Sequence, residues 1–187
     1  MDLPWGDALS GKFITNVGLI TSDGPYGPNV MAAEWTHHIS YSPGLIAINI
    51  RPTDATHANI MKSKEFGVNL CAFDQNLASS IAGGSSGKDV DKIKVLRELG
   101  VEFYKAKKIN VLMIKGAVMN AECKLAKAIE LGDHTTFVGE VVEASAIEKQ
   151  SLVYHDGKYW NIGERIQKPA QEVLDKISQL VEKYRKS

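Results

Sequence analysis

The segment 29–36, Asn-Val-Met-Ala-Ala-Glu-Trp-Thr, sets the expected architecture, because it predicts a β-strand whose small side chains let a flat ring approach the backbone. Segment 43–53, PGLIAINIRPT, predicts a second strand that delivers Arg51 to a turn. Segment 56–60, THANI, predicts a helix that begins directly after that turn. Two strands and a capped helix start in this order are typical of a binding site as well as of a core.

Composition indicates one globular domain without a general attraction for anions. The chain has 187 residues, 44% of them hydrophobic and 24% charged, which suits one sizeable core. Its 22 basic and 22 acidic residues cancel, so neither nucleic acid nor an anionic membrane is an expected partner. Any anion site is therefore local.

The sequence also predicts a cytoplasmic protein. Segment 1–7 is acidic and lacks an apolar core, and no run approaches the length that spans a bilayer. Cys71 and Cys123 lie far apart in strand-like runs, where buried free thiols are common.

Strand signals dominate the chain. Runs rich in β-branched residues predict strands at 13–21, from Asn29 onward, and at 45–52, 65–71, 117–129 and 135–147. Because these strands do not alternate regularly with helices, we expect an antiparallel sheet or barrel.

Four helices are expected around this sheet, at 56–63, 76–82, 88–99 and 171–184. Ser86 and Asp89 resemble a capping box at the start of the third helix, with Asp in place of Glu. The last helix is amphipathic and lies within 169–186, so we expect one domain, 1–187, that ends in this helix.

The turn between the second strand and its helix is a candidate anion site. A helix N-terminus offers free amides and a partial positive potential, and Arg51 adds a planar set of donors. Either Thr53 or Thr56 is the expected N-cap, with its hydroxyl bonded to the helix or turned to a ligand. The alternative is a capped helix beside a surface arginine.

Segment 83–92, GGSSGKDVDK, is a second candidate. It is not a nucleoside triphosphate loop, because Asp89 follows Lys88 where Ser or Thr is required. Lys88 and Lys92 are four residues apart and share one face of the expected helix, so they either reach a phosphate together or pair with Asp89 and solvent.

Histidines suggest one polar site and no metal centre. His134 follows a Gly132-Asp133 turn at the start of a long strand, where an imidazole is easily presented. His37 and His38 are adjacent, so on a strand they point to opposite faces and cannot form the usual metal pair. We therefore predict no bound metal.

Taken in order, these segments resemble the flavin reductase-like family, most closely its flavoredoxin branch. The match runs over nearly the whole chain. It is carried by 29–36, 43–52, Asn59-Ile60, 66–70, 86–92, Glu122-Cys123 and 132–141. The resemblance implies a mostly β fold with peripheral helices, an antiparallel, Greek-key, FMN-binding split β-barrel that works as a homodimer.

The resemblance also implies site residues. His134 matches a catalytic-site histidine near the reactive edge of the flavin. The residues implied to bind the cofactor, from ring to phosphate, are Asn29, Met31, Ala32, Ala33, Trp35, Thr36, Arg51, Thr56, Asn59, Asn69, Ser86, Lys88 and Lys92. Glu34 and His37-His38 depart from the family pattern, and Lys88 stands where an arginine is expected.

The implied function is an oxidoreductase that uses NADH or NADPH to reduce FMN, which then reduces a flavin, a ferric complex or a partner protein. His134 would position or polarise, because hydride transfer needs no protein acid. Trp35 either packs beside the cofactor or is a core aromatic residue. A non-enzymatic FMN-binding electron carrier remains the alternative.

Overall fold

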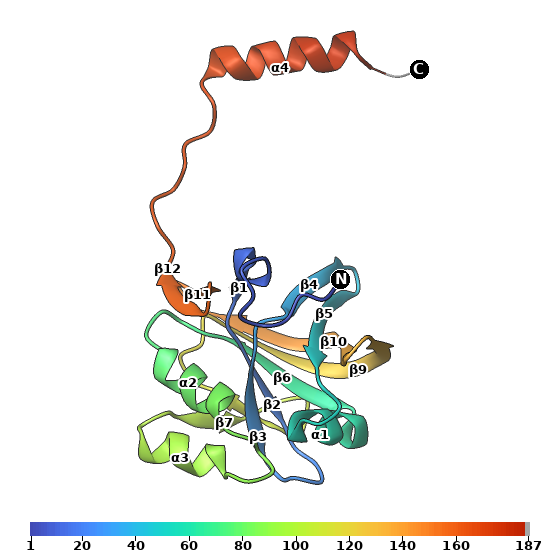
Figure 1. Ribbon diagram of the computed structural model, residues 1–187, viewed down its shortest axis with the longest axis vertical. Helices are drawn as coiled ribbons and strands as arrows, with labels where there is room; N and C mark the ends of the chain where they lie inside the picture. Colours follow the sequence, from blue (N-terminus) through green and yellow to red (C-terminus); the bar gives the residue numbers. More distant parts are fainter. Residues whose placement is uncertain (186–187) are drawn as a thin grey trace.

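The computed structural model describes residues 1–185, and antiparallel strands are its main regular structure (Figure 1). The main sheet has seven strands in the order β3-β2-β6-β9-β10-β5-β4. Its members are β2 (Gly18–Ser22), β3 (Asn29–Ala33), β4 (Thr36–Tyr41), β5 (Gly44–Ile50), β6 (Glu65–Leu70), β9 (Met119–Leu131) and β10 (His134–Ala146). The predicted antiparallel architecture with few helices is confirmed.

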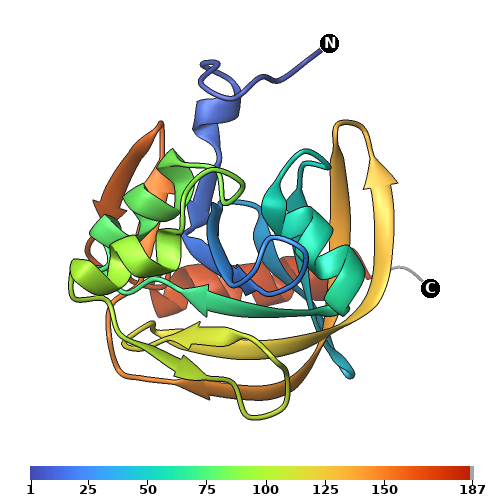
Figure 2. The same cartoon turned by 90° about the horizontal axis from the view of Figure 1, so that it is seen from below.

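The sheet curls until its two edges meet, as the view from below shows (Figure 2). Strands β3 and β4 are at opposite ends of the strand order, yet only Glu34 and Trp35 connect them. The Asn49 amide of β5 donates to the Trp35 carbonyl at 3.1 Å, and the Thr36 hydroxyl donates to the Ala33 carbonyl at 3.0 Å. The result is a barrel that is closed at this crossing and split elsewhere.

Gly18 makes the crossing possible. A Cβ atom at Gly18 would lie 2.5 Å from Thr36 Oγ1, closer than atoms can approach. The sequence predicted one strand over 13–21, but the chain divides at Val17. Its first half, β1 (Ile14–Asn16), instead joins a second sheet with β11 (Leu152–His155) and β12 (Lys158–Asn161).

Alternating side chains place one core on each face of the main sheet. Ile20 belongs to the core inside the barrel with Phe66 and Phe137. Its neighbour Leu19 points the other way, into a core that includes Leu96. This second core lies beneath α2 (Asn76–Gly84) and α3 (Lys92–Glu98).

Helix α1 (Ala55–Ser63) is tied to the loop between β2 and β3 by the amide of Asn59. The Asn59 Nδ2 group donates to Ser22 Oγ and to the Gly27 carbonyl, and its Oδ1 accepts from the Tyr26 N–H. Since all of Asn59 is buried, these bonds fix where α1 begins.

The predicted N-cap of α1 and the predicted start of the third helix are wrong. The N-cap of α1 is Asp54, not Thr53 or Thr56. The third helix begins at Lys92 rather than Lys88, because the Ser86 carbonyl and hydroxyl close a tight turn with the amides that follow. Asp91 then caps α3 by accepting the Lys94 N–H.

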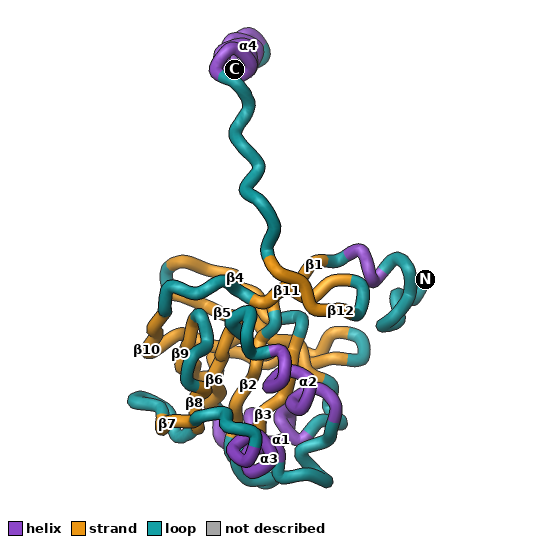
Figure 3. Tube along the Cα trace, turned by 90° about the vertical axis from the view of Figure 1, so that its left-hand side faces the viewer, coloured by secondary structure: helices purple, strands orange, loops and turns teal. Residues whose placement is uncertain are grey.

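The last helix, α4 (Gln171–Lys183), stands away from the barrel on an extended segment (Figures 1 and 3). It lies within the predicted range 169–186, of which residue 186 is outside the described part. None of the residues of α4, all of them described, is buried. Among residues 1–185, no helix has the length and apolar character needed to cross a bilayer.

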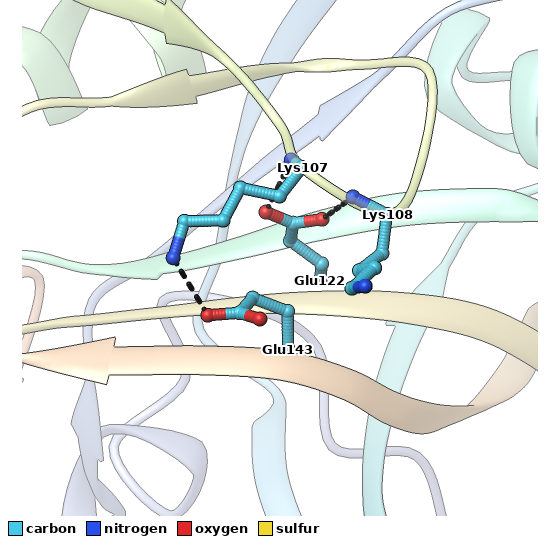
Figure 4. A network of polar contacts seen from close by, with 4 residues as sticks. All are labelled: Lys107, Lys108, Glu122 and Glu143. Carbon is cyan, nitrogen blue, oxygen red and sulfur yellow. Dashed lines mark hydrogen bonds and ion pairs between the residues drawn. The ribbon is translucent and has the colours of Figure 1, made fainter.

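A buried carboxylate anchors the hairpin of β7 (Phe103–Lys105) and β8 (Leu112–Ile114) to the main sheet (Figure 4). Glu122 is 4% exposed, and its two oxygens accept the amide protons of Lys107 and Lys108 at 2.8 and 2.6 Å. The Lys107 ammonium separately pairs with Glu143 at the surface.

We expect Glu122→Ala to lower the free energy of unfolding by about 2 kcal/mol, because two main-chain amides lose a buried, charged acceptor. Urea unfolding measures this loss. Glu143→Ala is the matched control and should cost less than half as much, since its ion pair is at the surface. Equal losses in the two variants would contradict the anchoring role of Glu122.

Candidate functional site

Three segments meet at one end of the barrel: the start of β3, the start of α1, and the loop 85–91 (Figure 1). Asn29 Nδ2 donates to Thr56 Oγ1 at 2.9 Å, and both side chains are buried. A Cβ atom at Gly87 would lie 2.3 Å from Asn29 Oδ1, so the loop rests directly on this pair. The structure therefore joins Asn29 and Thr56 directly and places the loop against them.

This corner carries several groups that suit an anion. Helix α1 presents the amides of its first turn, and the Asp54 carboxylate caps none of them within the described chain. Thr56 Oγ1 accepts from Asn29 and keeps its own proton for another acceptor. Arg51 and Lys88 are exposed cations on the two flanking segments, and Lys88 Nζ lies 5.4 Å from the centre of the Tyr26 ring.

Beside this corner is a hollow of about 410 Å³. The loop 87–91 forms one wall, and Lys94 and Arg97 of α3 add positive charge. Tyr26 contributes an aromatic face. The carboxylates of Asp89 and Asp91 also line the hollow, and Asp91 Oδ2 lies 3.2 Å from Lys94 Nζ, so its charge is mixed.

Three of the predicted cofactor contacts hold the scaffold instead. Asn59 is committed to the loop between β2 and β3, as described above. Asn69 donates to the Leu19 carbonyl and Thr21 Oγ1 and accepts from the Ile114 amide and Asn120 Nδ2, which uses all four of its hydrogen-bonding positions. The side-chain amides of Asn59 and Asn69 thus hold in place the segments on which the site is built.

Lys92 is the third such residue. Its ammonium donates to the carbonyls of Ala82 and Ser85, at 2.9 and 3.0 Å, at the C-terminal end of α2. Because the side chain is buried, the pKa of Lys92 falls to about 8, although the nearby charge of Asp54 partly opposes the shift. Lys92 and Lys88 therefore do not act as a pair on one helix face; Lys92 fixes the base of the loop that carries Lys88 and Ser86.

Strand β3 offers a flat, small-residue edge next to the corner. It is the terminal strand of the main sheet and pairs only with β2 among the described strands, so its other edge has backbone donors and acceptors to spare. Met31 packs on the core inside the barrel and Ala32 on the core below α2, and both are partly buried. Ala33 is buried at the crossing.

Trp35 and His134 lie together at the other side of the crossing. Their ring centres are 4.8 Å apart, and Trp35 is 46% exposed, so it is not a core aromatic residue. His134 Nδ1 lies 2.7 Å from Asp133 Oδ1. That hydrogen bond lowers the pKa of Asp133, and the positive charge of Arg51 lowers it further, which links the Arg51 turn electrostatically to the His134 turn.

Two supporting residues were not predicted. Asn49 holds the Trp35 carbonyl through its main-chain amide and its side chain, at 3.1 and 3.3 Å. An asparagine inside the apolar strand 45–50 was the signal that could have found it. His57 Nε2 lies 3.0 Å from Thr135 Oγ1, next to His134, and burial lowers the pKa of His57.

Thr36 is buried, with its hydroxyl bonded to the Ala33 carbonyl, so it stabilises the crossing. In the described part of the chain, no group of three His, Cys, Asp or Glu side chains is arranged to hold a metal ion. The site thus consists of a cationic corner, a strand edge and a tryptophan–histidine pair.

Comparison with known proteins relates this arrangement to flavin chemistry. The model of the flavin reductase like domain matches residues 10–163. The FMN reductase (NADH) SmoA of Agrobacterium fabrum is 25% identical over 80% of this chain and 80% of its own, and an uncharacterized protein of Archaeoglobus fulgidus is 35% identical over 70% of each. The structure of the Streptomyces globisporus NADH:FAD oxidoreductase SgcE6 superposes with a TM-score of 0.76, at 25% identity, over 83% of this chain and 90% of that protein.

The buried Lys92 generates a pH prediction. Below its folded-state pKa of about 8 the lysine is protonated in both states, so it adds no pH dependence. Between about 8 and the unfolded value near 10.4, the unfolded chain binds more protons at this residue, so the contribution of Lys92 to stability rises with pH by about 3 kcal/mol. The two buried thiols, whose pKa is raised to about 12, act in the opposite direction above pH 9, so the contribution of Lys92 is read as the difference in unfolding free energy between the unchanged protein and a Lys92→Met variant on either side of this window.

Lys92→Met should abolish that rise. Lys94→Met, on the exposed face of the same helix, should retain it. The interpretation fails when the two variants show the same dependence of unfolding free energy on pH.

Proposed function

Because the chain belongs to the flavin reductase like family, we propose that it is an enzyme that takes hydride from NADH or NADPH and passes electrons through bound FMN to an acceptor. The acceptor class comprises a free flavin, a ferric complex or a partner protein. The proposal rests on three features found in one chain: the cationic corner at α1, the free edge of β3 and the Trp35–His134 pair.

The corner fits a phosphate monoester. The first-turn amides of α1, the Thr56 hydroxyl proton and the Arg51 guanidinium all donate, which is what a dianionic group requires. Lys88 adds a mobile cation from the loop above Asn29. Arg51 and Lys88 are the candidates for direct phosphate contact, while Lys92 and Asn59 hold their segments in place.

The strand edge fits a planar ring. Ala32 and Ala33 keep the β3 edge open, and backbone groups along it match the alternating donors and acceptors of a flavin. Bound FMN supplies a hydride acceptor in its ring and can release electrons one or two at a time. Trp35 packs against the ring, and His134, oriented by Asp133, polarises its reactive edge or positions the nicotinamide.

Flavin identity distinguishes the relatives. SmoA is named an FMN reductase, whereas SgcE6 is an NADH:FAD oxidoreductase. We favour FMN because the corner ends in a compact cluster of donors beside a helix start, which suits a terminal phosphate. Titration of the protein with FMN and with FAD, followed by flavin fluorescence, compares the two affinities directly.

An anaerobic absorbance assay tests the reaction. The purified protein is mixed with FMN and then with NADH or NADPH in separate runs. Bleaching of the flavin faster than in a protein-free control supports a reductase and identifies its donor. Flavin that binds but stays oxidised until dithionite is added refutes the enzyme and supports the electron carrier.

We also propose that the protein is a homodimer in the cytoplasm. Nicotinamide cofactors are abundant there, and Cys71 and Cys123 are both buried free thiols, which suits a reducing compartment. Burial raises the pKa of each thiol to about 12, so neither is a reactive nucleophile.

We expect Arg51→Ala to weaken FMN binding by about 1 to 3 kcal/mol, because a charge-assisted hydrogen bond to phosphate is lost. Fluorescence titration measures the affinity. Arg165→Ala, which removes an exposed arginine beyond the matched domain, is the control and should bind FMN normally. Riboflavin, which lacks the phosphate, should bind the Arg51 variant and the unchanged protein equally; a large difference would remove Arg51 from the phosphate side.

We expect His134→Ala to slow flavin reduction about tenfold while FMN affinity stays within about twofold, since the histidine acts on the ring or the nicotinamide rather than on the phosphate. Stopped-flow absorbance gives the rate. His155→Ala on β11 is the control. A rate equal to that of the control would assign His134 a structural role only.

A further inference from the structure

Residues 162–185 form a C-terminal arm that, unlike the rest of the molecule, extends away from the barrel (Figure 3). It begins after β12, where the match to the family domain ends at residue 163, so it lies almost wholly outside that domain. Residues 162–170 are all exposed and run away from the barrel (Figure 3). At their end, α4 is a complete amphipathic helix, and none of its residues is buried by the rest of residues 1–185.

The apolar stripe of α4 needs a partner. Val173, Ile177, Leu180, Val181 and Tyr184 recur at helical spacing and are 44–70% exposed. A helix of 13 residues is marginal in water without tertiary contacts, so this one gains stability only when the stripe is covered. The opposite face of α4 is charged, so the apolar stripe is the side that would dock on a partner.

The barrel has a matching uncovered surface on β4. This strand is an edge of the main sheet, and Ile39 and Tyr41 on it are 51% and 93% exposed, next to Trp35 at 46%. A bulge between His38 and Ser40 in the pairing of β4 with β5 bends this edge strand, which disfavours the addition of another strand here. A helix can still cover this surface through contacts between side chains.

We propose that the arm of one chain crosses to a second copy and lays the apolar stripe of α4 on the β4 surface of that copy, with the exchange reciprocated. The arm leaves the body at the end of the molecule that also carries β4 (Figure 1). Two copies that face each other through this end place each arm beside the other's β4, as two-fold symmetry requires. Nine extended residues reach about 30 Å, enough for this crossing.

The area is sufficient for a stable dimer. A helix of 13 residues is about 20 Å long and about 10 Å wide, so half of its cylindrical surface is about 300 Å². Two arms and the two surfaces that receive them together bury about 1,200 Å², which is the lower end of the range for specific interfaces. The occupant of the β4 surface is therefore a second copy of this chain.

Charge placed in the stripe should break the dimer. In the full-length chain, Ile177→Glu with Leu180→Glu should raise the dimer dissociation constant at least about a hundredfold in sedimentation equilibrium. Ser178→Glu with Gln179→Glu, on the polar side of the same helix, is the matched control and should leave the dimer intact. Tyr41→Asp tests the receiving surface, with Leu99→Asp at the exposed end of α3 as its control. Circular dichroism confirms that each variant keeps its fold.

Cross-linking shows which chain receives the arm. One protein carries Leu180→Cys and a second carries Ile39→Cys, and the two are mixed with a short bis-maleimide; the native thiols are buried and protonated. A product of twice the chain mass supports the exchange. A double variant that cross-links within one chain overturns it.

The inference rests on the proposed homodimer and not on flavin reduction. Different results would refute the arm exchange and the homodimer. A dimer that survives the stripe and Tyr41 substitutions refutes the arm and leaves the homodimer standing. A full-length chain that is monomeric at all concentrations refutes both, whatever its activity with FMN.

Discussion

The two-residue crossing at Glu34-Trp35 is the constraint on which the remaining structure depends. It joins strands that lie at opposite ends of the sheet, so the sheet has to curl until its edge strands β3 and β4 meet. Gly18, the Thr36 hydroxyl and Asn49 are all needed at this point, because a close approach of two edges leaves no room for a side chain and no water for the backbone.

The candidate site is a consequence of that closure. A closed barrel would cover both edges of every strand, but this one meets only at the crossing and leaves the edge of β3 available. Helix α1 is held beside the opening by Asn59, and Asn29 and Thr56 join strand to helix below it. Buried amides thus position the helix start, while exposed cations at Arg51 and Lys88 supply the charge. Because the buried amides have this structural role, many polar side chains near the site are not exposed at its surface.

Sequence reasoning recovered the features that depend on local pattern. Alternation of apolar residues located most strands, and the spacing at 56–63 located α1 to within a residue. Sequence reasoning failed where the hydrogen-bond partners of a side chain lie far away in the sequence. Lys92 and Asn69 have the right chemistry for a ligand, but their bonds to the end of α2 and to Leu19 and Ile114 depend on packing that no local pattern records. The late start of α3 is similar: Ser86 can cap a helix or close a turn, and the contact of Gly87 with Asn29 favours the turn.

The same reasoning separates the barrel from its C-terminal helix. Periodicity identified α4 correctly, yet periodicity states only that one side of a helix is apolar and says nothing about what covers it. On the outer face of the sheet, the apolar sides of α2 and α3 have a partner within the same chain, because they pack against β3. The stripe of α4 and the apolar residues of the β4 edge are both left uncovered, and a single chain carries one of each. Since each surface needs what the other provides, we propose that two chains satisfy both at once, with the exposed β4 edge as the surface through which the protein pairs.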